Sequence, residues 1–365
     1  MTSYFCFRAR FQTNENDTER WSHRQDCPGG PETLQFLVSR GIIGSMNGDD
    51  TMLMLLIFAA AVLLVSLGCF LLACWSPGRK PLGPEEYDTP SGKIYEPFRE
   101  RMVDWIKEAR AMDYREVSVI SHDGLTLRGR YYQCSPGAPM ELMLHGYRGN
   151  AERDMGGGVQ RAFALGRNAL VVDQRGGGRS DGHIITFGVR ERYDCLRWVE
   201  YITKEFGPQQ KIILTGISMG AATVLLTGGM ELPDNVVGIL ADCGYTSAEA
   251  IIRKVLHQIH LPRSLYHLMR LGGRLFGGFD LNDADVLAAV ERCRVPVIFF
   301  HGETDNYVPC TMSRENFEAC PTTKKLVTVP DAGHGLSFLV NEERYIAELW
   351  EFGNEHWYDH KGGPL

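Results

Sequence analysis

The stretch KIILTGISMGAATVLL, residues 211–226, determines the fold. Its apolar beginning, Lys211–Leu214, predicts a buried strand, and its alanine- and leucine-rich end predicts a helix. Between the two lies the pattern G-x-S-x-G, in which a sharp turn holds Ser218 in a strained backbone conformation and exposes its hydroxyl. The pattern alone is weak in a chain with 40 glycines, but the flanking strand and helix make it specific. We therefore expect Ser218 to be a nucleophile.

On both sides of this turn, strand-like and helical patterns alternate from Arg115 onward. The first two strands are joined by a His-Asp-Gly hairpin turn at 122–124, and helical patterns cover 189–206 and 221–230. A hairpin followed by β-α repeats predicts a mostly parallel eight-stranded sheet with helices on both faces. Sites in such sheets form at the carboxyl ends of the strands. The expected strands are Val117–Ile120, Leu125–Tyr132, Glu141–Leu144, Ala169–Val172, Lys211–Leu214, Val236–Ala241, Val295–Phe300 and Lys325–Val329.

Two polar residues follow strands downstream of Ser218. Asp305 comes after Val295–Phe300, and His334 comes after Lys325–Val329. A serine hydroxyl needs a base to remove its proton, and that base needs a carboxylate to orient it. The order Ser, Asp, His, each behind a strand, is the order of hydrolases built on a parallel sheet. We expect Ser218, His334 and Asp305 to form a catalytic triad.

An acyl-transfer site also needs two backbone N–H groups for the oxyanion. One is expected from Met219, the residue after the nucleophile, because the first N–H groups of a helix are free. The other is expected in the loop after Glu141–Leu144, where Gly146 allows a close approach and Tyr147 follows. The sequence thus predicts an oxyanion hole formed by Tyr147 and Met219, with His145 bracing the loop.

At these residues the sequence resembles the α/β-hydrolase superfamily, close to its serine-aminopeptidase and lysophospholipase-like branch. The resemblance implies the α/β-hydrolase fold, with Ser218 as nucleophile, His334 as base and Asp305 as the residue that orients it. The family is catalytically broad, so its fold does not fix a substrate. The resemblance covers about residues 115–352 and rests on His145-Gly146, D-Q-R-G-G-G-R-S at 173–180, the turn at 216–220, H-G-x-x-D-x-x-V-P at 301–309 and Gly333-His334.

The amino-terminal part contains an apolar run, and no residue between Met52 and Trp75 is charged. A helix needs about 20 apolar residues to cross the hydrocarbon core, so we expect one transmembrane helix at 52–75. The alternatives are a buried core helix, which is usually shorter, and a cleaved signal peptide, which needs a basic segment before a shorter run. Residues 1–51 are expected to be a disordered extension, or sequence upstream of a true start at Met46 or Met52. Residues 76–114 are expected to be a linker followed by an amphipathic helix at 96–112, which either packs on the next domain or lies on the membrane.

The basic residues near the apolar run are unequally distributed. Arg79, Lys80 and Lys93 follow it, whereas only Arg40 precedes it within the range that sets orientation. This bias favours a catalytic domain that faces the cytoplasm, where unpaired cysteines also persist. The alternative is an outward-facing domain tethered by an uncleaved signal.

An insertion at 246–291 separates the sixth and seventh strands, where α/β-hydrolases carry a lid. Its apolar residues exceed what one packing face requires, so the insertion either forms a pocket for an acyl group or packs on the core. These residues are Ile251, Ile252, Val255, Leu256, Leu265, Leu268, Met269, Leu271, Leu275, Phe276 and Phe279. The hydrolase domain with this lid is expected to cover 115–365.

The composition of the chain argues against several classes of partner and cofactor. The chain has 365 residues, 44% of them hydrophobic, and a net charge of −7 without a basic block, which argues against nucleic acid as a partner. The ten cysteines form no zinc-site spacing, so we expect neither metal nor cofactor; Cys243 is either a reactive thiol or a packed residue. We expect a membrane-anchored serine hydrolase that cleaves small-molecule or lipid acyl esters. A serine aminopeptidase-like enzyme and a non-catalytic binding module on the same fold are the alternatives.

Overall fold

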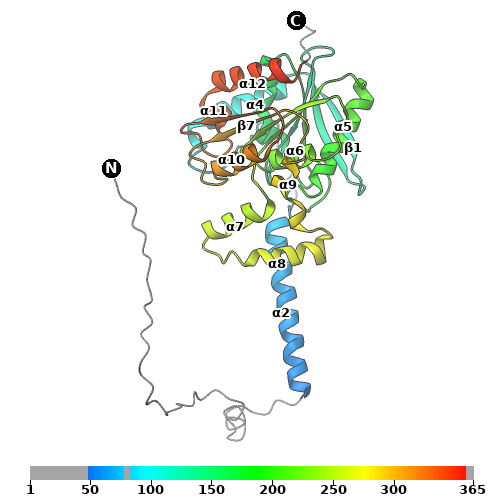
Figure 1. Ribbon diagram of the computed structural model, residues 1–365, viewed down its shortest axis with the longest axis vertical. Coiled ribbons are helices and arrows are strands. Elements are labelled where there is room, and N and C mark those ends of the chain that lie inside the picture. Colours follow the sequence, from blue (N-terminus) through cyan, green and yellow to red (C-terminus); the bar gives the residue numbers. More distant parts are fainter. Residues whose placement is uncertain (1–47, 78–82, 359–365) are drawn as a thin grey trace, which may run out of the picture. The chain divides into compact units, whose positions relative to one another are not determined.

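The computed structural model describes residues 48–77 and 83–358, whose central element is an eight-stranded sheet (Figure 1). The strand order is β1-β2-β4-β3-β5-β6-β7-β8. β1 pairs antiparallel with β2 and β2 antiparallel with β4, whereas every later pair is parallel. All eight expected strands are present, with ends that differ by up to three residues. They are β1 Arg115–Ile120, β2 Thr126–Tyr132, β3 Met140–Leu144, β4 Asn168–Val172, β5 Ile212–Ile217, β6 Val236–Asp242, β7 Val297–Gly302 and β8 Lys324–Val329.

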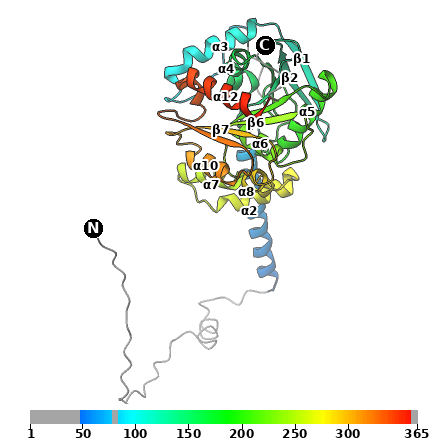
Figure 2. The ribbon, with the colours of Figure 1, turned by 45° about the horizontal axis from the view of Figure 1, so that its top comes forward.

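Helices cover both faces of the sheet because successive residues of a strand point to opposite sides. Leu142 of β3 packs in the same buried cluster as Trp198 of α5 and Leu225 of α6. The next residue, Met143, faces the other side and packs with Val159 of α4. Figure 2 shows α3, α4 and α12 together on that second side. The helices here are α3 Arg99–Ala111, α4 Ala151–Ala164, α5 Glu191–Phe206, α6 Met219–Gly228, α10 Cys310–Ala319, α11 Ser337–Val340 and α12 Glu342–His356.

The amphipathic helix expected at 96–112 is a 3-10 turn, Glu96–Phe98, followed by α3. It packs on the domain that follows it, the first of the two arrangements expected from the sequence, with Trp105 and Ile106 buried. The contact depends on Gly156 and Gly157 of α4, since a Cβ atom at Gly157 would lie 2.4 Å from the Trp105 ring and one at Gly156 would lie 3.4 Å from Ile106 Cγ1. Glycines in a helix interior are unfavourable by about 1 kcal/mol each relative to alanine, so they mark a close approach of the two helices.

The chain divides into two compact units, residues 1–59 and 60–365. The described part of the first, 48–59, is the beginning of helix α2 (Gly48–Cys74). Among the described residues, α2 is the helix that is long and apolar enough to cross a membrane by length and composition. It begins four residues before the span expected at 52–75; most of the extension expected at 1–51 lies outside the described residues.

In the second unit, the carboxyl-terminal part of α2 contacts the domain built on the sheet. Ser66, Phe70 and Cys74 are buried, Trp75 forms a β-bridge with Ile184, and the Ser76 N–H donates to the His183 carbonyl. The insertion after β6 then contributes α7 Ala248–Gln258, α8 Leu265–Gly272, the π-helical turn η2 Gly273–Gly277, the 3-10 turn η3 Leu281–Asp283 and α9 Val286–Val290.

Candidate active site

Ser218 lies between β5 and α6 with φ 56° and ψ −117°, in the left-handed half of backbone space that L-residues rarely adopt. The flanking glycines make this turn possible. A Cβ atom at Gly216 would lie 2.2 Å from the Gly220 carbonyl carbon, and one at Gly220 would lie 2.1 Å from the Leu144 carbonyl oxygen. The turn is also tied to the sheet, since the Ser218 N–H donates to the Asp242 carbonyl at 2.8 Å.

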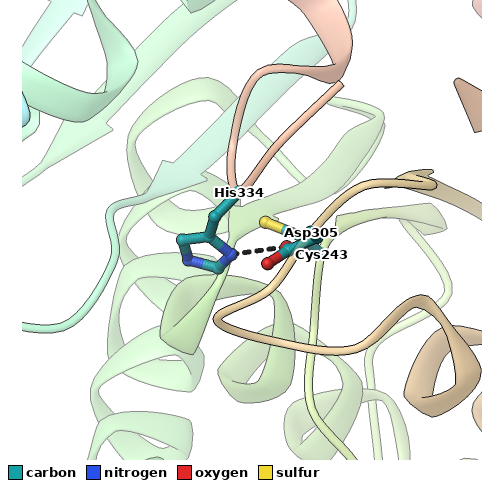
Figure 3. Close-up of side chains that lie close together, drawn as sticks. All are labelled: Cys243, Asp305 and His334. Carbon is teal, nitrogen blue, oxygen red and sulfur yellow. Dashed lines mark hydrogen bonds and ion pairs between the residues drawn. The ribbon is translucent and has the colours of Figure 1, made fainter. Parts of the chain in front are cut away.

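The three residues expected to form a triad are brought together at the carboxyl ends of β5, β7 and β8. Ser218 Oγ lies 2.9 Å from His334 Nε2, and His334 Nδ1 lies 2.7 Å from Asp305 Oδ2. Figure 3 shows the imidazole of His334 facing the Asp305 carboxylate. In this arrangement the carboxylate accepts a hydrogen bond from Nδ1–H and keeps the proton on that nitrogen, so that Nε2 is free to accept the serine proton.

The Asp305 carboxylate is held as an anion. Burial raises its pKa, but hydrogen bonding and charge from His301 and His334 lower it to about 2. Its second oxygen, Oδ1, accepts hydrogen bonds from the backbone N–H groups of Tyr307 and Val308 at 2.8 and 2.9 Å. Because the second oxygen is fixed by two amides, the first is aimed at His334.

The loop expected to supply the oxyanion donor lies next to Ser218. Its Gly146 N–H donates to Asp154 Oδ2 at 3.0 Å, and His145 Nε2 accepts from the Gln174 N–H at 2.9 Å, so His145 braces the loop as expected. Within the described ranges, no hydrogen-bond acceptor is recorded for the N–H groups of Tyr147 and Met219. Both therefore remain candidates for the oxyanion hole.

Ser218 and His334 open into a cavity of about 690 Å³ whose wall is largely apolar. The apolar wall comes from the segment before α3, from α3 and α4, and from α11. Its members include Ile94, Tyr95, Met102, Trp105, Ile106, Met155, Gly156–Gly158, Phe338 and Leu339.

For the insertion, the sequence left two arrangements open, an acyl pocket or packing on the core, and the structure shows the second. Of the insertion at 246–291, only Gln258 lines the cavity. Ile251, Ile252 and Met269 instead pack in the main core. The cavity wall is formed by α3 instead, which folds back against Gly156 and Gly157 of α4, a contact that the pattern of apolar residues does not encode.

Two residues of the site were missed by sequence reasoning. The Tyr95 hydroxyl donates to the His334 carbonyl at 3.0 Å, and the Tyr307 ring lies 5.0 Å from the imidazole of His334. Tyr307 lies inside the motif at 301–309 and could have been found there. Tyr95 comes from the segment before α3, about 120 residues from Ser218, and no sequence signal points to it.

Cys243 lies beside Asp305 and His334 (Figure 3), so these three residues could hold a metal by proximity. Burial raises the pKa of the Cys243 thiol well above its ordinary value, whereas a metal ligand must be a thiolate. A second group, His122, Asp123 and Asp194, has both carboxylates bound by the Arg175 guanidinium. The chemistry of the first group suits proton transfer, and the raised thiol pKa favours a packed Cys243 over a reactive one.

Comparisons with known proteins agree with this architecture. A family model described as alpha/beta hydrolase fold matches residues 142–273. The uncharacterized protein YqkD of Bacillus subtilis (strain 168) is 27% identical over 190 residues, 52% of this chain and 62% of that protein, so the match spans about three fifths of its length. The uncharacterized membrane protein YNL320W of Saccharomyces cerevisiae is 23% identical over 172 residues, 47% of this chain and 55% of that one.

Solved structures show the same fold. The Pyrococcus furiosus esterase Pf2001 superposes with a TM-score of 0.57 at 21% identity and covers 78% of this chain and 99% of its own. Est1E of Butyrivibrio proteoclasticus, solved with ferulic acid, gives a TM-score of 0.51 at 22% identity and covers 67% of this chain and 98% of its own. With its eight-stranded sheet and its serine at the turn after β5, the chain therefore has the α/β-hydrolase fold.

Proposed function

We propose that the protein is a membrane-anchored serine hydrolase that cleaves carboxylic esters. The observation that carries the proposal is the unbroken hydrogen-bonded series Ser218–His334–Asp305 at the edge of an apolar cavity. Acyl transfer by a serine requires a nucleophile, a base that takes its proton and an acid that orients the base, all in contact with one another.

In this mechanism, Ser218 Oγ attacks the acyl carbonyl carbon while its proton passes to His334 Nε2. The N–H groups of Tyr147 and Met219 stabilise the oxyanion. The tetrahedral intermediate collapses, and the imidazolium gives its proton to the departing alkoxide, which leaves as the alcohol. Water then attacks the acyl-enzyme with His334 again as base, which releases the carboxylic acid and restores Ser218.

The cavity supports an ester with an apolar acyl or aryl part. Its volume of about 690 Å³ lies within the range of small-molecule sites. Two structural neighbours are called esterases or were solved with an aromatic acid, in agreement with this substrate class.

Release of amino-terminal residues from peptides is the weaker alternative, because it needs a free carboxylate near Ser218 to hold the substrate amine. Among the described lining residues, the carboxylates are Asp154 and Asp242. Asp154 accepts from Arg153 and from the Gly146 N–H. Asp242 accepts from the hydroxyls of Ser337 and Tyr345, so both carboxylates already have partners.

The anchor is supported by the uncharged run at 52–75, the length of α2 and the exposure of its apolar side chains, among them Leu55 and Leu64. The yeast relative is called a membrane protein, in agreement with an anchor. We propose one transmembrane helix at 52–75, a connecting segment at 76–114, and a hydrolase domain at 115–365 with a lid at 246–291.

Fluorophosphonate labelling, combined with turnover of aryl esters of increasing chain length and of aminoacyl-arylamides, tests the proposal. Ser218→Ala is expected to abolish labelling and turnover without changing the thermal transition, and Ser135→Ala serves as the matched control. Asp305→Asn is expected to lower kcat by about 10⁴, since the wrong imidazole tautomer then forms. Labelling that survives Ser218→Ala would exclude Ser218 as nucleophile, and arylamide turnover above ester turnover would favour the peptidase.

A further inference from the structure

We propose that the first part of the insertion, residues 248–277, docks into the surface of an anionic lipid bilayer. We call these residues the insertion helices; they comprise α7, α8 and η2. The proposal rests on the membrane anchor of the proposed function and adds a second contact with the membrane.

The insertion helices pack directly against the carboxyl-terminal part of α2 (Figure 1). A Cβ atom at Gly272 would lie 2.5 Å from the Ser66 carbonyl oxygen and 2.6 Å from Phe70 Cβ, so the two backbones touch. The Phe70 ring lies 6.4 Å from the ring of Phe276 and 6.3 Å from that of Phe279. Any depth that Ser66 and Phe70 have in the membrane is therefore shared by Gly272 and Phe276.

The position of this contact along α2 sets its depth. Ser66 and Phe70 lie inside the uncharged run, nine and five residues before Trp75. At 1.5 Å per residue, these positions lie about 13 and 7 Å from the end of the run. The run of 24 residues is about 36 Å long as a helix, only a few ångström more than the hydrocarbon thickness of about 30 Å. Both residues therefore lie below the headgroups. A segment in contact with them lies where interfacial helices insert, about 5–10 Å into the membrane surface.

The insertion helices expose the apolar side chains that such a position requires. Ile259 and Leu275 are each 54% exposed, Phe276 is 45% exposed and Leu261 is 39% exposed. They form two exposed stretches, one between α7 and α8 and the other in η2. In water, this exposure is unfavourable, and insertion into lipid removes it.

Charge selects an anionic surface. Residues 248–277 contain five basic residues and one acidic residue, a net charge of +4, whereas the whole chain carries −7 and the remainder therefore carries −11. Arg263 lies in the exposed stretch next to Leu261, and His257 and His260 flank it. Basic residues at the surface of an anionic membrane contribute about 1 kcal/mol each to binding. Arg253 pairs with Glu249, and Arg270 and Arg274 both pair with Asp280, just beyond this segment. Among the described residues of the segment, Lys254 and Arg263 therefore carry the attraction to a negatively charged bilayer.

The test uses the full chain in vesicles of phosphatidylcholine and phosphatidylglycerol that carry a diazirine on a lipid acyl chain. After illumination, crosslinked peptides are mapped by mass spectrometry. Crosslinks are expected on α2, on 257–264 and on 274–277, but not around Ile120, an equally exposed apolar residue at the end of β1. Crosslinks on α2 without any on the insertion helices would overturn the docking and leave the anchor standing. If α2 itself remains unlabelled, the anchor fails as well.

Two variants separate docking from general apolar exposure. Leu275→Asp combined with Phe276→Asp is expected to lower crosslinking of the insertion helices by about tenfold or more, with α2 crosslinks unchanged. Ile120→Asp is the matched control and is expected to change neither. Vesicles of phosphatidylcholine alone are expected to lower insertion crosslinks about tenfold, since the contribution of the basic residues is lost. The proposal would be contradicted if crosslinking of the insertion helices changed neither in the double aspartate variant nor in vesicles without anionic lipid.

Discussion

Asp305 combines burial with hydrogen bonds from two backbone amides and from the imidazole of His334, and His301 Nε2 lies 3.4 Å from its Oδ2. These neighbours define how the stability of the fold depends on pH. The folded-state pKa of about 2 lies below the ordinary value of 3.8, so the ionised carboxylate stabilises the fold above pH 4. This contribution is lost as the pH falls toward the folded-state pKa.

We therefore expect the stability difference between the wild type and Asp305→Asn to shrink with acid. From the lowered pKa of Asp305, we expect the free energy of unfolding of the wild type to fall by about 1 kcal/mol by about pH 3 through this residue alone. The thermal transitions of both proteins, measured in detergent between about pH 6 and pH 3, report the difference. A constant gap over this range would mean that Asp305 is not held as proposed.

At the same scale, the sequence predicts some site residues and not others for clear reasons. Ser218, Asp305 and His334 each follow a strand within a recognisable motif, so topology alone brings them to one edge of the sheet. Tyr95 reaches His334 from a segment that precedes the sheet. A long-range contact of one hydroxyl with one carbonyl leaves no periodic or local pattern.

Among the elements, the contact between α3 and α4 is sensitive to a single methyl group. A Cβ atom at Gly157 would lie 2.4 Å from the Trp105 ring, whereas one at Gly156 would lie 3.4 Å from Ile106 Cγ1. Gly157→Ala is expected to destabilise the protein by about 1–3 kcal/mol through overpacking. Gly156→Ala is the control, and its better helix propensity is expected to offset its contact. Thermal unfolding of the two variants distinguishes them; equal transitions would show that α3 does not pack as described.

The chain-length preference is expected to depend on α11 and α3 and not on the insertion. Phe338 lines the cavity and stacks on Trp105 with ring centroids 5.2 Å apart, whereas Leu268 does not line it. Phe338→Ala is expected to shift turnover toward longer acyl chains, since each buried methylene contributes about 0.8 kcal/mol. Leu268→Trp is expected to leave the ester series unchanged. A shift caused by Leu268→Trp alone would return the pocket to the insertion.

The sequence predicts where strands and helices lie along the chain more reliably than it predicts which of them pack against each other. Buried strands such as Ile212–Ile217 are apolar on both faces, which makes them recognisable within a few residues. The apolar residues of the insertion were equally visible, but apolar character alone does not say whether a residue faces the core, a cavity or a lipid. Ile251 faces the core and Leu275 is exposed, although both are large aliphatic residues.

For the molecule as a whole, the distribution of basic residues predicts a hydrolase domain inside the cell. Cys134 is exposed and provides a reporter in that domain. A membrane-impermeant maleimide on intact cells is expected to spare the peptide that contains Cys134 and to label it after lysis, with Cys134→Ser as the control. Labelling of this peptide before lysis would reverse the orientation and leave the anchor unaffected.

The carboxyl end of α2 is capped by the loop that carries the expected oxyanion donor. The Tyr147 hydroxyl donates to the Ala73 carbonyl at 2.6 Å, and the Arg148 guanidinium donates to the carbonyls of Leu72 and Trp75 at 2.8 Å. A helix that is too long or too short for its bilayer tilts or shifts. If α2 spans the membrane as proposed, these bonds would pass such a displacement to the neighbours of Ser218. Hydrolysis of a water-soluble ester should therefore vary with the thickness of the host bilayer, and Tyr147→Phe should flatten this dependence. The rate of hydrolysis would then report the thickness of the membrane around α2.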